Sequence, residues 1–415
     1  MNKNVAFTIC AKNYLAQAYT LKQSFKTFNP DCDFFIFLSD DSKDVKEEEN
    51  NLILLDDSWI PKWKQMAFKY NVIEFSTSIK PFCFKKLFAQ EYEKVIYLDP
   101  DIYVTHSLDE IYHSLNEKSI ILTPHYCNIQ TEYTGSITEE EILFVGIYNL
   151  GFTAISNNSI GNKIVSWWMN RLANKCYADK IDALHVDQKW MDFIPAFFPD
   201  DTLVSHHMGM NPAIWNLHER ELIIDSKNNY QIKNLESNIT FPLLFFHFSG
   251  FDPFKPTLIN RRHPKYNTGV YPSYIPLFES YVNDVYKNGY NKYSKMAYSF
   301  NSFENGENVI ALQRRIFRKL ENDFSDIENP FADGRFLAEL KKNKLLTGIK
   351  SNAFSTYTET QKSRKSTLEK LIVNGLKFVK ICVGIRYYSS FLMFLTEQIR
   401  LENQVFLMKN NGKNQ

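Results

Sequence analysis

Two carboxylates, Asp99 and Asp101, follow directly on the apolar run VIYL at 95–98, with one proline between them. Side chains so placed at a strand end can converge on one divalent cation. Carboxylate oxygens suit Mg²⁺ or Mn²⁺, which can in turn hold a diphosphate and offset the charge that develops on a leaving phosphate. A solvated turn would show the same pattern, but an α/β setting favours a metal site.

A histidine occupies a comparable position later in the chain. His247 opens the segment HFSG after the apolar run PLLFF at 242–246. An imidazole at the end of a buried strand could face the same pocket as the two aspartates. Lys255 follows shortly and could reach a phosphate as a point charge. A lone histidine of this kind is often an ordinary polar residue, so the hypothesis depends on the aspartate pair.

These polar residues are set among short apolar strands. The sequence predicts a helix from 14 to 28 that ends at Asn29-Pro30, and further helices at 160–172 and 187–194. Alternation of apolar strands with helices predicts an α/β domain with a Rossmann-like mixed, mostly parallel sheet covered on both faces. Ligands of such sheets bind beyond the carboxyl ends of the strands. The strands expected are 4–10, 34–41, 94–101, 119–124, 150–156 and 242–248.

Composition narrows the function classes. The 415 residues are 44% hydrophobic, enough for a large core, and 48 basic against 47 acidic residues leave a net charge of +1. This balance argues against nucleic acid as a partner. The six cysteines form no CxxC pair, which disfavours a cysteine metal site and fits a reducing compartment. The N-terminus lacks the apolar run of a signal peptide, and no uninterrupted apolar run reaches about 18 residues, so a cytoplasmic protein is expected.

Five motifs in order resemble one enzyme family. They are FTICAKNYLAQAYTLKQSF, KPFCFKKLFAQEYEKVIYLDPDIYV, YNLGFTAIS, HVDQKW and HFSGFDPFKP, over roughly 4–258. This set is similar to the family 8 glycosyltransferases, the group of glycogenin and the bacterial lipooligosaccharide galactosyltransferases. The resemblance implies a GT-A fold, a nucleotide-sugar donor and transfer with retention. Its front-face mechanism uses the leaving phosphate as base, so no dedicated protein base is assigned.

The resemblance also implies a role for each matching position. Asp99, Asp101 and His247 would bind Mn²⁺ or Mg²⁺. For donor binding, it implies Ala11, Asn13 and Tyr14 near the base and ribose, Lys80 at the phosphate or sugar, and Gly250 and Lys255 at the diphosphate. Asn149, with Gly151 beside it, and Asp187 would hold the sugar hydroxyls. Gln188 would lie beneath the anomeric carbon, and Asp187 and Gln188 are the catalytic positions.

The chain departs from the family pattern in two places. Ala11 and Lys12 stand where the family often has an acidic residue for uracil, which puts UDP in question, and Asp40 or Asp41 could supply a replacement contact. Lys255 also lies two residues later than the usual spacing.

Several of these residues have a plainer interpretation. Asn149 and Gly151 could form a strand start with a bulge, Asp187 a helix N-cap, Gln188 a surface residue and Lys80 a surface lysine. Trp215 and Asn216 could line the acceptor side, or belong to the core.

The sequence predicts five regions. They are a catalytic domain at 1–270, a helical extension at 271–345, a linker at 346–367, an amphipathic helical segment at 368–408 and a disordered tail at 409–415. In the fourth region, Leu368, Leu371, Ile372, Leu376 and Val379 form an apolar stripe flanked by Lys370, Lys377, Lys380 and Arg386. This helix could pack on the catalytic domain or on a second copy of the chain, or lie on the anionic inner membrane face near a lipid-linked acceptor.

The function expected is metal-dependent sugar transfer from a nucleotide sugar, most simply a UDP-sugar, to a glycan, lipid-linked or protein-linked acceptor in bacterial surface polysaccharide synthesis. A sugar-phosphate nucleotidyltransferase is one alternative, although the segment AKNYLAQAYTLKQ lacks that class's glycine-rich loop. A catalytically dead scaffold of the same fold that binds a protein partner is the other.

Overall fold

The computed structural model describes residues 3–43, 45, 52–348 and 360–408, with the side chains of 360–368 outside that description. The chain divides into two compact units. Unit 1 comprises Met1–Trp63 and Val72–Tyr298, and unit 2 comprises Lys64–Asn71 and Ser299–Gln415. Unit 1 contains all the residues to which the sequence assigned a role in a site.

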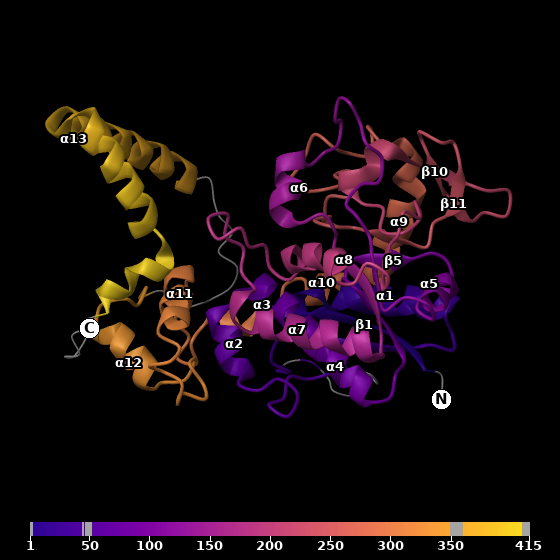
Figure 1. The fold of residues 1–415 in the computed structure, drawn as a ribbon, viewed down its shortest axis with the longest axis horizontal. Helices are drawn as coiled ribbons and strands as arrows, with labels where there is room; N and C mark the ends of the chain where they lie inside the picture. Colours follow the sequence, from indigo (N-terminus) through magenta and orange to yellow (C-terminus); the bar gives the residue numbers. More distant parts are fainter. Residues whose placement is uncertain (1–2, 44, 46–51, 349–359, 409–415) are drawn as a thin grey trace. The chain divides into compact units, whose positions relative to one another are not determined.

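A seven-stranded sheet forms the centre of unit 1 (Figure 1). β7 runs antiparallel to both of its neighbours, whereas the other pairs in the sheet are parallel. The predicted mixed, mostly parallel α/β sheet is therefore confirmed. In spatial order the strands are β3 (Leu52–Ile53), β2 (Asp33–Leu38), β1 (Asn4–Cys10), β4 (Lys94–Leu98), β7 (Phe152–Ser156), β6 (Ile120–Leu122) and β8 (Thr202–Val204).

Helices cover both faces of this sheet because its strands are apolar on both sides. α1 (Leu15–Phe28) packs on one face, where the Phe25 ring lies 5.1 Å from that of Phe34. α4 (Lys80–Ala89) covers the other face, where the Phe84 ring lies 4.9 Å from that of Phe7. α1 ends where the sequence predicts, since the Asn29 side chain donates to the Phe25 carbonyl oxygen at 3.0 Å.

One predicted strand lies outside the central sheet. The segment PLLFFHF forms only the short strand β12 (Phe245–His247), which pairs antiparallel with β5 (Ile102–Val104) in a separate two-stranded sheet. An apolar run does not specify its partner strand, so the sequence placed this one in the wrong sheet. A third sheet contains β9 (Arg220–Ile224), β10 (Tyr230–Asn234) and β11 (Thr240–Pro242).

The remaining elements of unit 1 are helical. They are α3 (Val72–Ser78), α5 (Asp109–Ser114), α6 (Glu139–Val145), α7 (Ser159–Lys175), α8 (Ile194–Phe197), α9 (Ile275–Lys287), α10 (Tyr290–Tyr293) and the 3-10 helices η1 (Lys12–Tyr14), η2 (Gln188–Phe193), η3 (Ile214–Glu219) and η4 (Pro272–Tyr274).

The regular secondary structure in the described part of unit 2 is mainly helical, as the sequence predicts for the C-terminal region. Its helices are α2 (Trp63–Lys69), η5 (Ser299–Asn301), α11 (Ala311–Lys319), α12 (Arg335–Lys342), α13 (Thr360–Gln398) and η6 (Leu401–Leu407). Most of the expected linker (349–359) and the expected tail (409–415) lie outside the described residues. The domain boundaries expected after 270 and 345 stay predictions.

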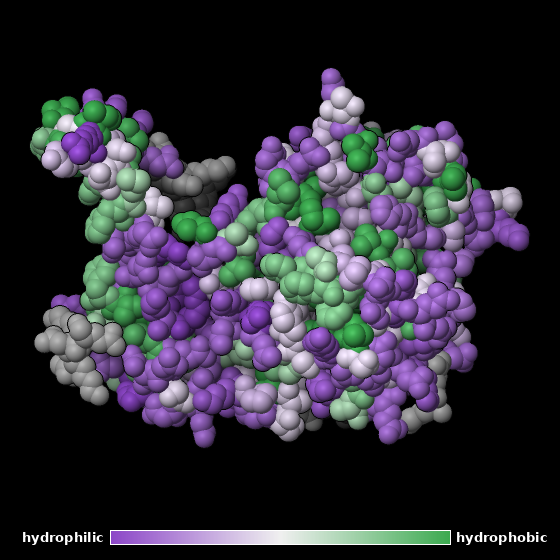
Figure 2. All heavy atoms as spheres, in the orientation of Figure 1, coloured by the Kyte–Doolittle hydropathy of each residue, from purple (hydrophilic) through white to green (hydrophobic). Residues whose placement is uncertain are grey.

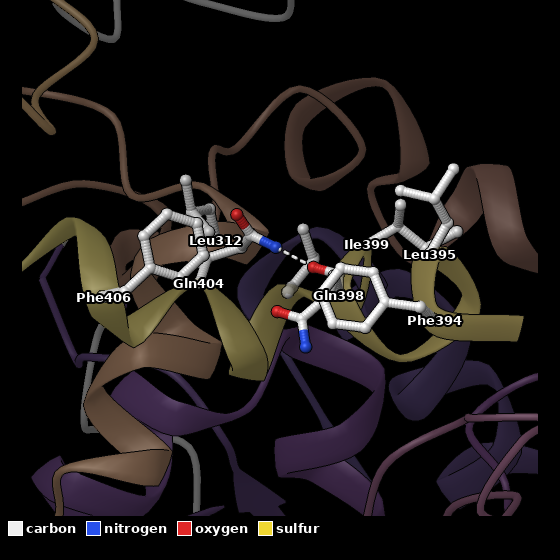
Figure 3. Close-up of a pocket in the computed structure, with 8 residues that line it drawn as sticks. Leu312, Phe394, Leu395, Gln398, Ile399, Gln404 and Phe406 are labelled. Atoms are coloured by element: carbon white, nitrogen blue, oxygen red, sulfur yellow. Dashed lines mark hydrogen bonds between the residues drawn. The ribbon is translucent and has the colours of Figure 1, made fainter. Parts of the chain in front are cut away.

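The end of α13 and η6 line an apolar hollow of about 650 Å³ beside α11 (Figure 3). The Gln404 side chain donates to the carbonyl oxygen of Gln398 at its rim. The apolar side chains around it are Leu312, Phe394, Leu395, Ile399, Leu401 and Phe406.

Residues 369–398 of α13 modify the expectation that no segment could span a membrane. By length and composition they form a helix that could do so, because an 18-residue window within it has a mean hydropathy of 1.4 and is not buried. The criterion of an uninterrupted apolar run misses it because Lys377, Lys380 and Arg386 break the run.

A buried arginine joins the chain segments of unit 2. The guanidinium of Arg314, which is 3% exposed, donates to the carbonyl oxygens of Ala67, Phe68, Tyr70 and Phe300, at 3.0, 2.8, 2.7 and 2.5 Å. These carbonyl groups lie on separate segments, so one side chain ties them together.

Arg314→Met should destabilise unit 2 by about 3 kcal/mol or more, because buried carbonyl oxygens lose their donors. Lys319→Met, on the exposed face of the same helix, is the matched control and should change stability little. Thermal unfolding of the two variants measures the difference. Equal melting temperatures would contradict the role of Arg314.

Candidate metal and donor site

Three potential metal ligands meet at one edge of unit 1. One ligand atom from each of Asp99, Asp101 and His247 lies within 4.8 Å of the others. The Nε2 atom of His247 is 3.2 Å from Oδ1 of Asp101 and 3.7 Å from Oδ2 of Asp99. The structure thus brings together the three residues to which the family resemblance gave the metal.

Strand pairing creates this cluster. Asp99 and Asp101 lie in the turn between β4 and β5, and β12 pairs with β5 so that His247 is opposite Ile102. The backbone N–H of Phe248 donates to the carbonyl oxygen of Asp101 at 2.8 Å, which fixes the register next to the cluster. The histidine therefore comes from a strand distant in sequence but adjacent in space.

Two neighbours hold the candidate metal ligands in place. The buried hydroxyl of Tyr97 donates to Oδ1 of Asp99 at 2.5 Å, leaving Oδ2 on the side of His247. Gly151 packs against the imidazole so closely that a Cβ atom there would be 2.3 Å from Cε1 of His247. Glycine is the residue that this approach permits, which gives Gly151 a packing role beside the site.

Lys80 and Asp187 form a buried ion pair next to this cluster. The lysine Nζ is 2.5 Å from Oδ2 of Asp187 and donates to the Leu150 carbonyl oxygen at 2.8 Å. The lysine also lies 4.1 Å from the centre of the Tyr97 ring. The plainer interpretations are thereby excluded, because Lys80 is 1% exposed and the Asp187 side chain caps no helix. Burial raises the pKa of Asp187 even though Lys80 is adjacent.

Asn149 and Gln188 continue the buried polar set. Oδ1 of Asn149 accepts the N–H of Gly151 at 3.1 Å, and its Nδ2 is 3.5 Å from Oε1 of Gln188. Gln188 accepts the N–H of Leu150 at 3.0 Å through Oε1 and donates to the Val145 carbonyl oxygen at 2.9 Å. Both amides are buried, so Gln188 is not the surface residue that the plainer interpretation supposed.

The segment after β1 is linked electrostatically to the cluster through Tyr14. Ala11 is buried and Asn13 and Tyr14 are half-buried in η1. Burial raises the pKa of Tyr14, and the Asp101 carboxylate adds to that rise while Arg261 and Arg262 oppose it. Tyr14 therefore shares its electrostatic surroundings with Asp101, a candidate metal ligand.

The carboxylates of Asp40 and Asp41 already form hydrogen bonds and an ion pair within the protein. Asp40 accepts the N–H groups of Lys12 and Asp41, at 3.3 and 2.9 Å. Asp41 pairs with the Lys12 ammonium at 2.5 Å. These carboxylates brace the turn after β1, which weakens the idea that either replaces the missing acidic contact to a base.

The segment after β12 presents two cations that the sequence analysis missed. Lys255, Arg261 and Arg262 are all exposed, and the two arginines oppose the rise in the pKa of Tyr14. Gly250 has φ +70°, and its carbonyl oxygen accepts the N–H of Arg261 at 3.0 Å. The pair of adjacent arginines in NRRHPK was the only sequence signal for them.

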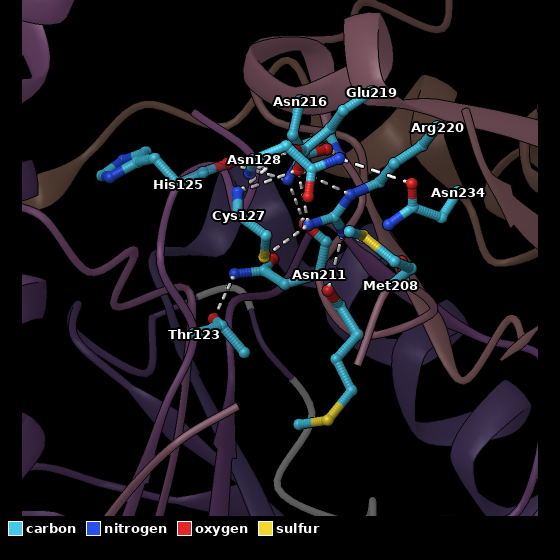
Figure 4. A network of polar contacts seen from close by, with 12 residues as sticks. Thr123, His125, Cys127, Asn128, Met208, Asn211, Asn216, Glu219, Arg220 and Asn234 are labelled. Atoms are coloured by element: carbon cyan, nitrogen blue, oxygen red, sulfur yellow. Dashed lines mark hydrogen bonds and ion pairs between the residues drawn. The ribbon is translucent and has the colours of Figure 1, made fainter. Parts of the chain in front are cut away.

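Trp215 and Asn216 do not offer a sugar platform. Trp215 is 4% exposed and packs edge-on against His247 with ring centres 5.2 Å apart. Asn216 is buried and donates to the carbonyl oxygens of His125 and Asn211 (Figure 4). The interpretation of Trp215 as core is the one that the structure supports.

The electrostatics of the cluster favour a cation. Burial lowers the pKa of His247, but the Asp101 and Asp99 carboxylates outweigh it, so its pKa lies above the ordinary value. Two half-buried carboxylates and one buried imidazole, gathered at one place, are suitable ligands for Mn²⁺. Mg²⁺ fits the two oxygen ligands but has less preference for the nitrogen.

Solved glycosyltransferase structures are among the known proteins to which this chain is similar. No protein-family model and no curated protein matches the sequence. The chain is similar to a crystal structure of the galactosyltransferase LgtC in complex with donor and acceptor sugar analogs, with 14% identity, 67% of this chain and 95% of that chain covered, and a TM-score of 0.38. It is also similar to the WbbM bifunctional glycosyltransferase, with 12% identity, 69% of this chain and 51% of that chain covered, and a TM-score of 0.39. For the glycosyltransferase GlyE of Streptococcus pneumoniae the identity is 15%, the coverage is 70% of this chain and 64% of that chain, and the TM-score is 0.35.

Mn²⁺ affinity should rise with pH across the neutral range. A protonated imidazole cannot bind metal, and because the pKa of His247 lies above 6.5, protons compete with the metal near neutrality. Where the protonated form dominates, affinity should fall about tenfold per pH unit. Electron paramagnetic resonance of free Mn²⁺ at several pH values measures this. In His247→Gln, residual binding should lose that dependence, and a wild-type affinity independent of pH would contradict the assignment.

Proposed function

We propose that this protein is a metal-dependent GT-A glycosyltransferase. It transfers a sugar from a nucleotide-diphosphate sugar, most simply a UDP-sugar, to a glycan or a lipid- or protein-linked acceptor, with retention, in the synthesis of a bacterial surface polysaccharide. The observation that carries the proposal is the convergence of Asp99, Asp101 and His247 beside the buried pair Lys80–Asp187. Each of the five positions matches a motif of the family 8 glycosyltransferases.

Charge balance supports this assignment. Three carboxylates, those of Asp99, Asp101 and Asp187, lie in one electrostatic neighbourhood with the Lys80 ammonium. A divalent cation between Asp99 and Asp101 would bring the group to neutrality. Bound there, the metal would supply positive charge to the diphosphate of the donor. Arg261 and Arg262, exposed like Lys255, would add the further charge that a diphosphate needs.

The residues around the metal site then have separate tasks. Lys80 orients the Asp187 carboxylate through the 2.5 Å ion pair, and Asn149 and Gln188 hold each other at 3.5 Å. These fixed dipoles need not reorganise when a sugar binds, which is the condition for effective electrostatic stabilisation. The Asp187 carboxylate would accept hydrogen bonds from sugar hydroxyls, and the Asn149 amide would donate to them. Gln188 would face the anomeric carbon. Asn13 and Tyr14 would contact the base and ribose.

A thermal-shift screen with UDP, GDP, CMP, ADP and TDP tests the donor site. One diphosphate should stabilise the wild type only when Mn²⁺ is present, by about 2.7 kcal/mol at 100 times its dissociation constant. Asp101→Asn should abolish this shift and Mn²⁺-dependent turnover, yet leave the metal-free melting temperature nearly unchanged, because the backbone contact to Phe248 remains.

Asp200→Asn, at an exposed turn of the same unit, is the matched control and should retain the nucleotide shift. If no nucleotide stabilises the wild type with any metal, the proposal fails and the scaffold alternative takes its place. If Asp101→Asn lowers the melting temperature strongly without metal, Asp101 is structural.

We also propose that the protein works at the inner face of the membrane, held there by α13. All its described side chains from Glu369 on are exposed or half-buried, and exposed large hydrophobic residues recur along its length, seen as green among purple in Figure 2. Lys370, Lys377, Lys380 and Arg386 lie among them, with Glu369 and Glu397 at the two ends of residues 369–398. A helix that combines exposed apolar area with this basic excess suits the surface of an anionic bilayer.

Residues 369–398 are better suited to lie in the interface than to cross the bilayer. At about 1.5 Å per residue the helix is long enough to span the bilayer. Arg386 would then lie near the bilayer centre, where inserting an arginine costs about 2.5–3.5 kcal/mol of free energy. Gly384, with φ +75°, also interrupts the helical backbone two residues earlier. Broken hydrogen bonding is expensive inside hydrocarbon and tolerable at the headgroups.

The protein should bind vesicles that contain phosphatidylglycerol and not those of phosphatidylcholine alone. Replacing Lys377 and Lys380 with glutamine should weaken binding about thirtyfold, since each lysine contributes about 1 kcal/mol at such a surface. Lys341→Gln with Lys342→Gln, at the end of α12, is the matched control. Vesicle sedimentation at low salt measures the affinities, and equal binding to both vesicle types would contradict electrostatic docking.

A further inference from the structure

Asn211 links the metal ligand to the sugar-binding amides. Its side chain is 1% exposed, and its Oδ1 lies 3.1 Å from Nδ1 of His247. Its Nδ2 donates to Oδ1 of Asn149 at 3.1 Å and to Oγ1 of Thr123 at 3.0 Å. One amide therefore contacts both parts of the proposed site.

Backbone groups determine the direction of each hydrogen bond. Gly151 donates its N–H to Asn149, so the accepting atom of Asn149 is an oxygen. The atom of Asn211 that faces this oxygen must then be its NH₂ group, and the atom that faces His247 must be its carbonyl oxygen. Nδ1 of His247 consequently carries a hydrogen. This tautomer leaves Nε2, on the side of Asp99 and Asp101, to bind a metal.

The same series of bonds extends to the catalytic glutamine. Asn149 donates toward Gln188, whose Oε1 also accepts the N–H of Leu150. The orientation of each amide is thus set by its neighbour, from His247 through Asn211 and Asn149 to Gln188. A substitution of Asn211 would therefore disturb the orientation of both the His247 imidazole and the Gln188 amide.

The turn that carries Asn211 is held from several sides. Asn211 has φ +57°, a conformation that asparagine and glycine tolerate best. Its carbonyl oxygen accepts from Asn216, and the carbonyl oxygens of Met208 and Met210 accept from Arg220 at 2.9 and 3.1 Å (Figure 4). The side chain therefore approaches His247 from a fixed backbone.

We infer that Asn211 is a positioning residue that fixes the metal-binding tautomer of His247 and joins it to Asn149. The inference rests on the metal site of the proposed function and adds to it a residue outside the five motifs. Partners of this kind, which bond the far nitrogen of a ligating histidine, typically contribute about 10- to 100-fold to metal affinity.

Two substitutions separate this role from a merely structural one. Asn211→Gly keeps the backbone conformation but removes the acceptor, so Mn²⁺ affinity should fall about 10- to 100-fold. Asn211→Asp retains an acceptor for Nδ1–H of His247, and the Thr123 hydroxyl can turn to donate to it. Only the contact to Asn149 becomes repulsive, so this variant should lose thermal stability and yet bind Mn²⁺ nearly as well as the wild type.

Electron paramagnetic resonance of Mn²⁺ with the full-length protein, without nucleotide, provides the readout, and a thermal melt of each variant accompanies it. Asn228→Gly, at an exposed turn with φ +66°, is the matched control and should leave Mn²⁺ affinity unchanged. If Mn²⁺ affinity follows melting temperature across the variants, or stays unchanged in Asn211→Gly, the inference is wrong while the proposed function stands. If the wild type binds no Mn²⁺, the metal site itself fails, and the inference with it.

Discussion

The antiparallel pairing of β12 with β5 is the contact on which the candidate site depends. It places His247 opposite Ile102 and so beside Asp101, from which it is distant in sequence. Because side chains alternate along a strand, a slip of one residue would turn His247 to the other face and bring Phe246 or Phe248 to the aspartates. Phe246 and Phe248 resist such a slip, since both pack against the ring of Phe278 on the opposite side. The apolar packing of this small sheet thereby fixes the geometry of a polar site.

Electrostatics set the second constraint. Burial disfavours the ionised form of a carboxyl group, and it raises the pKa of both Asp99 and Asp187. The Lys80 ammonium acts against this for both, through the ion pair with Asp187 and at longer range with Asp99. Tyr97 lies between them, its ring under the ammonium and its hydroxyl on Asp99. A site arranged in this way has excess negative charge without a metal, and a divalent cation would stabilise it by offsetting that charge. A centre that binds a diphosphate through a metal requires this property.

The sequence predicted what depends on local pattern. Apolar runs that end in carboxylates gave the strands of the central sheet and the position of Asp99 and Asp101, because burial of both faces leaves a continuous apolar signature. It did not predict which strand β12 joins, since strand partners are chosen by packing at long range. Asn211 belongs to no motif, and its significance comes from a left-handed turn and three contacts that only the folded chain creates. Trp215 illustrates the same limit, because an aromatic residue near a site has the same sequence signal whether it faces a sugar or, as here, the back of a histidine.

The turn that carries Asn211 shows why a buried ion pair would be retained in this region. A buried pair such as Glu219–Arg220 is often no more stabilising than apolar residues of the same volume. Here, however, each charge also satisfies backbone groups that no helix or strand bonds: Glu219 accepts the N–H groups of Cys127 and Asn128, and Arg220 donates to Met208 and Met210. The pair therefore replaces a hydrogen-bond ladder between two irregular segments. One of them carries the asparagine that contacts His247, so the rigidity of this candidate metal ligand derives in part from an ion pair that lies outside the candidate site.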